Sequence, residues 1–448
     1  MLGLGETGLS MAKWLTRRGA RVAVADTRAA PPNADALHRA CPEATLVTGG
    51  FKRELFTGID LVAISPGVPL VEPEVHAAIV RGVPVAGDIE LFAQALGPNP
   101  VAKTIGITGS NGKSTVTAMA GAMCRNTSRR VVVAGNIGPA VLDALMAAEE
   151  RDEHPDIWVL ELSSFQLETT SSLRLDAAAM LNLSEDHLDR YPGMREYAQA
   201  KARIFAGNGV QVLNRGDAAS LAMRIDGRQA VTFGDDGPGT AVDWGVRDGY
   251  LVQGDRPAMR TSELRVRGMH NVGNALAAFA LTRAIGLEVA ELAAGLAGFT
   301  GLPHRMQQVA TLRGVRFIDD SKGTNVGATV AALSGMDRPT VLIAGGDGKG
   351  QDFAPLAPAV AAHARAVVLI GRDAGLLARA LDSASVPLRS ATTMDDAVRQ
   401  AFGLANPGDA VLLSPACASF DMFRNYAHRA EVFVAAVKAL EVQLGSAA

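Results

Sequence analysis

The sequence predicts an α/β protein built on parallel sheets, and three observations support this prediction. Apolar runs recur along the 448 residues, and many end in a loop of Gly, Asp, Ser or Asn, as in AKTIGITGS, DIWVLELSS and PTVLIAGGD. Stretches of helical character, such as 9–19 and 271–285, separate these runs. Strands that alternate with helices form parallel sheets with right-handed crossovers, and ligands bind at the carboxyl ends of such strands.

The composition excludes several classes of protein. Hydrophobic residues make up 48% and charged residues 20%, which is typical of packed domains and rules out disordered, collagen-like and coiled-coil chains. The 43 Lys and Arg nearly balance the 46 Asp and Glu, so no basic excess indicates nucleic-acid binding. The longest stretch without Asp, Glu, Lys or Arg is 268–282, shorter than the ~20 apolar residues of a membrane span. We therefore expect no nucleic-acid partner and no membrane span.

Cysteine usage and the first residues indicate a compartment. Cys41, Cys124 and Cys417 are far apart and form no C-x-x-C pair, which favours reducing conditions and gives no thiolate metal site. The opening MLGLGETGLS lacks a basic stretch and carries a Glu in its short apolar part, unlike a signal peptide. We therefore expect a cytoplasmic protein.

Two Gly- and Pro-rich segments divide the chain into three expected domains. LGPNP separates a Rossmann-like N-terminal domain, residues 1–96, from a P-loop-type central ATPase domain, residues 97–299. GFTGLPHR lies at the start of a Rossmann-like C-terminal domain, residues 300–448. Only two residues precede Gly3, although such a glycine turn normally follows a strand, so we expect the first strand of the N-terminal domain to be missing.

The strongest local motif is a phosphate loop between a predicted strand and a predicted helix. Its glycines let the backbone wrap a phosphate, Lys113 neutralises charge, and Ser114 can ligate Mg²⁺. Ile107 stands where the strict G-x-x-x-x-G-K-S/T pattern has its first Gly. A glycine turn with an exposed lysine is the alternative, which the strand and helix on either side disfavour. The loop consists of Gly109, Ser110, Asn111, Gly112, Lys113, Ser114 and Thr115.

Further polar residues follow the central strands. Glu161 ends the apolar run DIWVLE, and carboxylate oxygens are ligands that Mg²⁺ prefers. His187 lies in SEDHLDRY among three acids and an Arg, which favours a site over a structural histidine. Lys201 in EYAQAKARIF, taken by itself, reads as a solvated helix lysine.

The N-terminal turn GLGETG matches G-x-G-x-x-G, a weak signal when it stands alone. Asp26 ends the next predicted strand, where an acid would bind the ribose of a nicotinamide dinucleotide, so a dehydrogenase stays an alternative. Thr27 and Arg28 follow directly, and together with the separate phosphate loop they favour a non-redox nucleotide or a nucleotide sugar.

Three cations of the C-terminal region lie on loops, and each could be surface charge. They are Arg305 in LPHR, Lys322 in DDSKGTN and Lys349 in GGDGK. Their shared position next to apolar strands favours a convergent site for an anion. Polar residues that accompany them are Asp320, Thr324 and Ser419.

As a set, these motifs resemble the Mur ligase family over essentially the whole chain. The resemblance rests on GITGSNGKST, GNIG, LELSSFQLE, SEDHLDRY, the Lys201 segment, GMHNVGN, LPHR, DDSKGTN, GGDGKG and LLSPACASFDMF. Together they are specific, although each alone is not. The motif D-N-P-R of diaminopimelate- or lysine-adding members does not occur, which favours a member that adds D-glutamate.

The resemblance implies a three-domain ligase that uses ATP to add D-glutamate to UDP-N-acetylmuramoyl-L-alanine in peptidoglycan precursor synthesis. ATP phosphorylates the acceptor carboxylate, the amine attacks the acyl phosphate, and ADP and phosphate are released. Catalysis then consists mainly of positioning and charge neutralisation. Two Mg²⁺ ions and a carbamylated lysine are implied, and we expect a monomer.

The resemblance also implies a role for each matching residue. The catalytic residues would be Lys113, His187 and Lys201. Ser114 and Glu161 would hold one Mg²⁺, and His187 with Lys201 as a carbamate would hold the second. Besides the phosphate loop, the ATP-binding residues would be Asn271, Asn274, Arg305 and Asp320. The UDP-substrate residues would be Thr7, Asp26, Thr27, Arg28 and Asn136. The D-glutamate residues would be His187, Lys322, Thr324, Lys349, Ser419, Phe420 and Tyr426.

Two further rivals complete the set of hypotheses, one a related ligase and one from a different class. A folylpolyglutamate synthetase shares the central and C-terminal motifs but has no UDP-binding counterpart of residues 1–95. A nucleotide-dependent switch or motor needs only the phosphate loop and has no reason for the cations around His187, Lys201, Lys322 and Lys349.

Overall fold

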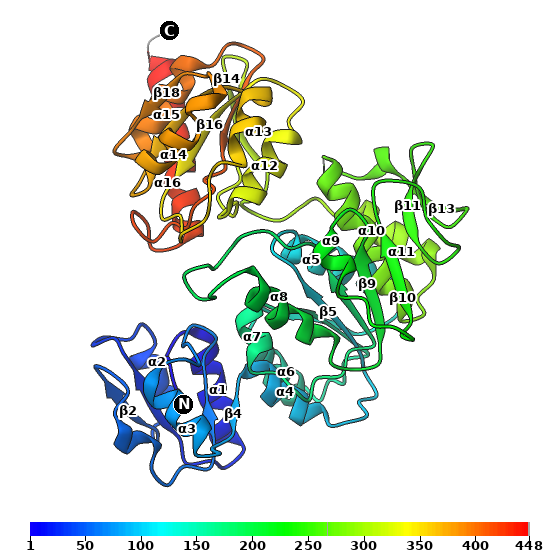
Figure 1. Ribbon diagram of the computed structural model, residues 1–448, viewed down its shortest axis with the longest axis vertical. Coiled ribbons are helices and arrows are strands. Elements are labelled where there is room, and N and C mark those ends of the chain that lie inside the picture. The colour runs from blue at the N-terminus through cyan, green and yellow to red at the C-terminus, as the bar shows by residue number, and fades with distance from the viewer. Residues whose placement is uncertain (267, 447–448) are drawn as a thin grey trace. The chain divides into compact units, whose positions relative to one another are not determined.

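The computed structural model describes residues 1–266 and 268–446 and is shown in Figure 1. The chain forms two compact units, and the expected α/β class with parallel sheets is confirmed. The segment that carries SEDHLDRY, which we expected in the central domain, groups with the second unit. Unit 1 comprises Met1–Asn182, Arg195–Glu263 and Gly273–Gly298, and unit 2 comprises Leu183–Met194, Leu264–Val272 and Phe299–Ala448.

The N-terminal part of unit 1 contains two short parallel strand pairs, β1–β2 and β3–β4. Leu2 forms parallel bridges to Ala25 and to Ile64, so the residue just before Gly3 lies between the two pairs. The elements are α1 (Glu6–Arg17), β1 (Ala23–Asp26), α2 (Ala34–Ala40), β2 (Thr45–Thr48), η1 (Arg53–Phe56), β3 (Val62–Ala63), α3 (Pro73–Val80), β4 (Val85–Ala86) and α4 (Asp88–Leu96).

Helix α1 begins earlier than the expected range 9–19, directly within the glycine turn. Gly5 precedes it with extended backbone, and Glu6 lies in the first turn, where a carboxylate favours the positive end of the helix dipole. A Cβ at Gly8 would lie 1.9 Å from the carbonyl oxygen of Gly3, so the turn and the helix can approach only because Gly8 lacks one.

The rest of unit 1 is a nine-stranded sheet of order β13-β12-β11-β10-β9-β8-β5-β7-β6. The strands from β6 to β10 pair in parallel, whereas β11–β12 and β12–β13 are antiparallel. The strands are β5 (Lys103–Thr108), β6 (Val131–Gly135), β7 (Ile157–Glu161), β8 (Ala177–Met180), β9 (Val210–Asn214), β10 (Ala230–Phe233), β11 (Trp244–Arg247), β12 (Tyr250–Gln253) and β13 (Arg256–Arg260).

The helices of this region flank or follow these strands. The predicted helix 271–285 corresponds to α10, whose apolar side chains are buried on several sides. The helices are α5 (Lys113–Arg125), α6 (Val141–Glu150), α7 (Ser164–Glu168), α8 (Met194–Ala202), η2 (Arg203–Phe205), α9 (Ala218–Leu221), η3 (Thr261–Glu263), α10 (Met269–Ala284) and α11 (Val289–Ala297).

The sheet of unit 2 has the order β14-β15-β19-β16-β17-β18, with β14 antiparallel to β15 and the other pairs parallel. The elements are β14 (Gln307–Leu312), β15 (Val315–Asp319), α12 (Val326–Ser334), β16 (Thr340–Gly345), α13 (Leu356–His363), β17 (Ala364–Ile370), α14 (Ala374–Ala380), η4 (Asp382–Ala384), β18 (Leu388–Ser390), α15 (Met394–Leu404), β19 (Ala410–Leu413) and α16 (Tyr426–Ser446).

Both faces of this sheet are buried, as expected of a parallel sheet covered by helices. Leu342 and Ala344 of β16 pack in the cluster that contains α12 and α13. Val341 and Ile343 of the same strand point the other way, into the cluster that contains α15 and α16. Figure 1 shows these two pairs of helices on the two sides of the sheet. Polar loops are therefore left at the strand ends.

Within the described part of the chain, no helix is both long enough and apolar enough to cross a membrane.

Candidate functional site

The phosphate loop lies between β5 and α5, as the sequence predicted. Two lysine ammonium groups converge on one of its carbonyl oxygens: Lys113 Nζ lies 2.9 Å and Lys201 Nζ 2.7 Å from Gly109 O. Lys113 Nζ also donates to Ser110 O at 2.9 Å. Two cations at the N-terminal end of a helix favour an anionic ligand such as a phosphate.

The shape of this loop depends on its glycines. Gly112 has a φ of +83°, and a Cβ at this position would lie 2.6 Å from Asn274 Oδ1. Asn274 therefore packs directly against the loop at a point that only glycine tolerates. Both residues belong to unit 1, so the structure brings this predicted ATP-binding pair together.

Asn182, which the sequence analysis did not single out, fastens the loop to the neighbouring strand. Its Oδ1 accepts from Asn111 N at 2.8 Å, its Nδ2 donates to Asn111 O at 3.1 Å, and its carbonyl accepts from Ser110 N at 2.9 Å. Asn182 follows β8, and its polar side chain after the apolar run AAAML was the signal that could have identified it.

Lys201 is 1% exposed, so it is no solvated helix lysine, the reading that its sequence context alone suggested. Its ammonium group lies 4.7 Å from the centre of the Tyr197 ring, and Tyr197 OH is 3.3 Å from Ser110 Oγ. A lysine is rarely buried unless it has a specific partner, and here the surroundings are the phosphate loop itself. Lys201 therefore belongs to the same site as Lys113.

Glu161 ends β7 and is 1% exposed. One carboxylate oxygen accepts from Asn136 Nδ2 at 2.5 Å, whereas Oε2 is buried and has no hydrogen-bond partner among the described residues. A buried carboxylate oxygen without a partner is costly unless a ligand satisfies it. The donor set near the loop, Glu161 with the hydroxyl of Ser114, thus fits a hard cation such as Mg²⁺.

Asn136 reaches Glu161 because two strands approach closely. A Cβ at Gly135 would lie 2.3 Å from Glu161 O, and Asn136 N donates to that oxygen at 2.9 Å. The described residues contain no group of three or more His, Cys, Asp or Glu with the geometry of a metal site. The metal ligands predicted in unit 1 are Ser114, Glu161 and Lys201, and of these only Glu161 belongs to the four residue types of such a group.

Asp26 and Arg28 form a compact pair beside the N-terminal glycine turn. Arg28 donates from Nε to Asp26 Oδ1 at 2.9 Å and from Nη2 to Oδ2 at 2.7 Å, and Leu4 N donates to Oδ2 at 2.7 Å. The hydrogen bonds from Arg28 lower the pKa of Asp26 to about 2, against the opposing effect of burial. Asp26 thus holds the turn and orients Arg28, while Thr7 lies in the first turn of α1 and Thr27 is exposed.

In unit 2, Asp320 and Arg305 lie at the carboxyl end of β15. Asp320 is 8% exposed, and burial raises its pKa to about 7, although the Ser414 hydroxyl at 2.7 Å and the charge of Arg305 oppose this shift. His304 Nδ1 lies 2.7 Å from Asp319 Oδ2. The predicted pair Arg305 and Asp320 is therefore brought together.

Lys322 and Tyr426 also meet, since Lys322 Nζ lies 3.8 Å from the centre of the Tyr426 ring. Ser321, next to Lys322, donates from Oγ to Tyr426 O at 2.8 Å. Arg429, which is fully buried, donates to Ser321 Oγ, Ser321 O and Cys417 O at 3.0, 2.8 and 3.1 Å. Arg429 was not identified from the sequence, because an arginine in a C-terminal helix normally reads as surface charge.

Lys349 forms an ion pair with Asp186 of the SEDHLDRY segment. Asp186 is 6% exposed and also accepts from Asn325 Nδ2 at 3.2 Å. His187 has a φ of +58° and its Nε2 lies 3.6 Å from Asp186 Oδ2. The predicted residues Lys349 and His187 thus lie on either side of one buried carboxylate within unit 2.

The other predicted residues of unit 2 differ in burial. Ser419 is 3% exposed, whereas the Phe420 side chain is 74% exposed and contributes little to any enclosed site in this form of the chain. Thr324 is half-buried in the turn after β15, where its N–H donates to Lys322 O at 2.9 Å. Asn271 is 8% exposed and belongs to unit 2, whereas Asn274 belongs to unit 1.

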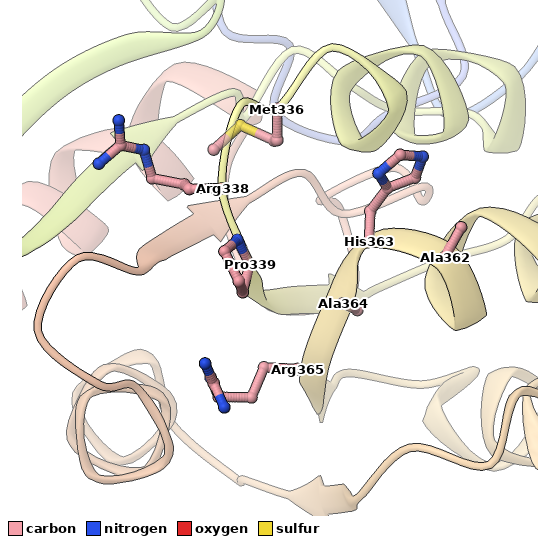
Figure 2. A pocket seen from close by; sticks show the side chains of 7 residues that line it. All are labelled: Met336, Arg338, Pro339, Ala362, His363, Ala364 and Arg365. Atoms are coloured by element: carbon pink, nitrogen blue, oxygen red, sulfur yellow. The ribbon is translucent and has the colours of Figure 1, made fainter.

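A shallow cavity of about 420 Å³ lies away from these residues, at the amino-terminal ends of β16 and β17 (Figure 2). Its two guanidinium groups already have carboxylate partners, with Arg338 2.8 Å from Asp337 and Arg365 2.5 Å from Asp409. We assign it no ligand. Its lining residues are Met336, Arg338, Pro339, Ala362, His363, Ala364 and Arg365.

Three family models match successive parts of the chain. Residues 1–87 match the Mur ligase MurD-like N-terminal domain, residues 107–282 the Mur ligase middle domain, and residues 304–417 the Mur ligase glutamate ligase domain.

Curated relatives match along nearly the whole chain. The UDP-N-acetylmuramoylalanine–D-glutamate ligase of Nitrosospira multiformis is 59% identical, over 98% of this chain and 95% of the relative. The ligase of the same name from Burkholderia mallei is 51% identical, over 100% of this chain and 97% of the relative.

Solved structures share the fold at low sequence identity. UDP-N-acetylmuramate-alanine ligase from Thermotoga maritima gives a TM-score of 0.62 at 19% identity, over 98% of both chains. Folylpolyglutamate synthase from Mycobacterium tuberculosis gives a TM-score of 0.57 at 18% identity, over 79% of this chain and 94% of that chain. Together with the family models and the curated relatives, these matches show that the chain belongs to the Mur ligase family and is an ATP-dependent ligase.

Proposed function

We propose that this chain joins D-glutamate to UDP-N-acetylmuramoyl-L-alanine at the expense of ATP, through an acyl-phosphate intermediate. The observation that carries the proposal is the 59% identity over nearly the full length to a relative named for this reaction. The arrangement of phosphate loop, Lys113, Lys201 and Glu161 in unit 1 supports the use of ATP.

The proposed reaction has two steps. The acceptor carboxylate attacks the γ-phosphorus of ATP, the bond to the bridging oxygen breaks, and ADP leaves. The amine of D-glutamate then attacks the acyl phosphate, and the tetrahedral intermediate expels phosphate as the amine loses a proton. Lys113 neutralises charge on the transferring phosphoryl group, and the backbone N–H groups at the start of α5 hold its oxygens.

The proposed metal ligands are Ser114 and Glu161 for one Mg²⁺, and His187 with carbamylated Lys201 for a second. Bound Mg²⁺ would supply positive charge beside the phosphate oxygens. Carbamylation joins CO₂ to the neutral amine of Lys201 and releases a proton, which turns a cation into an oxygen ligand. The position of Lys201 supports this assignment, because its side chain is buried and its Nζ lies against the phosphate loop, 2.7 Å from Gly109 O.

The substrate sites follow the same proposal. Asn274 and Asn271 flank the adenine, Arg305 binds the ATP phosphates and Asp320 binds the ribose. The UDP group lies beside the N-terminal glycine turn, with Thr7, Asp26, Thr27, Arg28 and Asn136 around it. The carboxylates of D-glutamate bind the cations and hydroxyls of unit 2, namely Lys322, Thr324, Lys349 and Ser419, with His187, Phe420 and Tyr426 completing the pocket.

The division into residues 1–96, 97–299 and 300–448 assigns one ligand to each part, in the order UDP substrate, ATP and amino acid. A monomer in the cytoplasm completes the proposal. Sedimentation of the purified chain in solution tests the monomeric state, and a stable dimer would contradict it.

The decisive experiment measures phosphate release from ATP with each substrate omitted in turn. We expect release only when UDP-N-acetylmuramoyl-L-alanine and D-glutamate are both present. Equal use of L-glutamate, or of a folate as acceptor, would contradict the proposal, and an absorbance change with NAD(P)H would instead support a dehydrogenase.

A further inference from the structure

Gln351, in the turn after β16, makes an unusual set of contacts for a residue outside the predicted site. Its side chain is 7% exposed. Its Oε1 accepts from Val326 N at 2.9 Å, and its Nε2 donates to Gly348 O at 2.9 Å and to Ala416 O at 3.1 Å. A single amide thus uses both its donors and an acceptor on backbone atoms.

These three backbone atoms lie in, or directly after, three different loops at the carboxyl edge of the unit 2 sheet. Val326 follows the turn after β15 that carries Thr324, Gly348 precedes Lys349, and Ala416 lies in the loop between β19 and Ser419. Each loop therefore contributes at least one residue of the proposed amino-acid pocket. Backbone bonds also join the loops in pairs, from Ala416 N to Gly323 O and between Asp347 and Ala418, but Gln351 contacts all three.

Two of these loops contain a backbone conformation that side chains disfavour. Lys349 has a φ of +51° and Ala416 a φ of +60°. Such left-handed residues cost free energy and persist only where surrounding contacts determine them. Gln351 donates to the carbonyl of the residue before Lys349 and to the carbonyl of Ala416 itself, so it holds the backbone at both positions.

Gln351 is also linked to Lys349 indirectly, through the start of α12. Val326 is the first residue of α12, and the N-cap Asn325 accepts from Ala328 N at 2.8 Å through its Oδ1. The other end of the Asn325 amide donates to Asp186, which forms the ion pair with Lys349. Gln351 thus holds the first residue of α12 in place. Asn325, at the start of the same helix, holds Asp186, and Asp186 in turn positions the Lys349 ammonium group.

We infer that Gln351 is a positioning residue for the amino-acid substrate: it touches no substrate itself but keeps three loops in the geometry that binds D-glutamate. The inference rests on the proposed function, because it takes Thr324, Lys349 and Ser419 as the carboxylate-binding residues. Loops held in advance spare the substrate the entropic cost of ordering them.

The test measures KM for each of the three substrates in Gln351→Met and Gln351→Ala. Met keeps the side-chain volume and removes the hydrogen bonds, so it separates the effect of the lost hydrogen bonds from the effect of a cavity. Loss of these buried bonds should raise KM for D-glutamate about tenfold, and leave KM for ATP and the UDP substrate within about twofold, in both variants.

Gln211→Ala is the matched control. Gln211 is also buried and bonds backbone groups, with Nε2 donating to Met223 O at 3.0 Å and Oε1 accepting from Ile225 N at 2.9 Å. It lies in β9 of unit 1 and its partners belong to no proposed substrate loop. It should therefore leave KM for D-glutamate unchanged.

Three outcomes would overturn the inference. One is an unchanged KM for D-glutamate in Gln351→Met, and another is an equal rise of all three KM values. The third is the same rise for D-glutamate in Gln211→Ala. If Gln351→Ala does not fold, Gln351→Met decides alone. Wild-type protein that turns over ATP without need of D-glutamate would instead refute the proposed function, so the two failures are distinct.

Discussion

The phosphate loop of unit 1 and the amino-acid loops of unit 2 are shaped by different means. In the phosphate loop, glycines such as Gly112 create the space, and the side chains of Lys113, Asn182 and Lys201 contact the loop backbone. In unit 2, buried polar side chains such as Gln351 and Arg429 bind backbone atoms of loops that are distant in sequence. The phosphate loop thus depends on the missing Cβ of Gly112, whereas the unit 2 loops depend on long polar side chains that reach their backbone.

Lys201→Ala tests the unit 1 side of this comparison with the largest expected effect. Its ammonium group lies on the phosphate loop and it is a proposed metal ligand, so kcat should fall at least about 1000-fold. Added short-chain carboxylates should restore part of the rate, since they supply the oxygen ligand. A control is Lys103→Ala, whose side chain is 54% exposed and pairs with Asp176. Absence of rescue would argue against the carbamate.

Gly112→Ala tests whether glycine shapes the phosphate loop. The added Cβ would meet Asn274 Oδ1 at 2.6 Å, so ATP-dependent turnover should fall about 100-fold through misplaced donors. Gly286→Ala is the matched control, because Gly286 has a similar φ of +90° with nothing within 4 Å of its Cβ. Equal losses of activity in the two variants would mean that backbone strain, and not the contact with Asn274, decides the result.

Arg429→Ala tests the side-chain bracing of unit 2. The substitution leaves Ser321 O and Cys417 O without their buried donor, but it also removes the cost of burying the guanidinium charge. The net effect should lower the free energy of unfolding by about 2 kcal/mol. Denaturant titration measures this change. Arg424→Ala, at an exposed position of the preceding loop, should change it by less than about 0.5 kcal/mol. A wild-type stability for Arg429→Ala would show that backbone contacts alone hold these loops.

Asp320→Asn tests unit 2 through a change in pH dependence, which has a definite sign. Its pKa is raised to about 7 in the folded chain, so between pH 4 and 7 the folded state binds a proton that the unfolded state has lost. The free energy of unfolding should therefore fall as pH rises through this window, and more steeply in the wild type than in Asp320→Asn. Exposed Asp60→Asn is the control, and parallel pH profiles for wild type and Asp320→Asn would refute the assignment.

Much of the fold could be predicted because its signals are local. Apolar runs became buried strands, and α10 and the phosphate-loop helix lie where their patterns indicated. The boundaries of α1 were wrong by a few residues, because Gly5 permits the helix to begin inside the glycine turn. The apolar stretch IDLVAISPG, residues 59–67, contributes only the two-residue strand Val62–Ala63, which pairs with β4, since strand length depends on the partner available.

The site could be predicted only in part. Lys113 and Glu161 were singled out because motif and strand end are visible in the sequence: Lys113 begins α5 after the phosphate loop, and Glu161 ends β7. Asn182, Gln351 and Arg429 were missed, since an Asn, a Gln or an Arg has no special spacing when its partners are backbone atoms elsewhere in the chain. Their role depends on burial, which a single sequence does not reveal for polar residues.

The sequence by itself thus determined the α/β class, the phosphate loop and the family, because periodicity and short motifs encode local geometry and chemistry. Only the tertiary structure decided that Lys201 is buried on the phosphate loop, that Lys349 meets Asp186, and which polar side chains hold the loops of unit 2. The physical reason is that these contacts join residues far apart in sequence, and the energy of a buried polar group depends on the partners that folding brings to it.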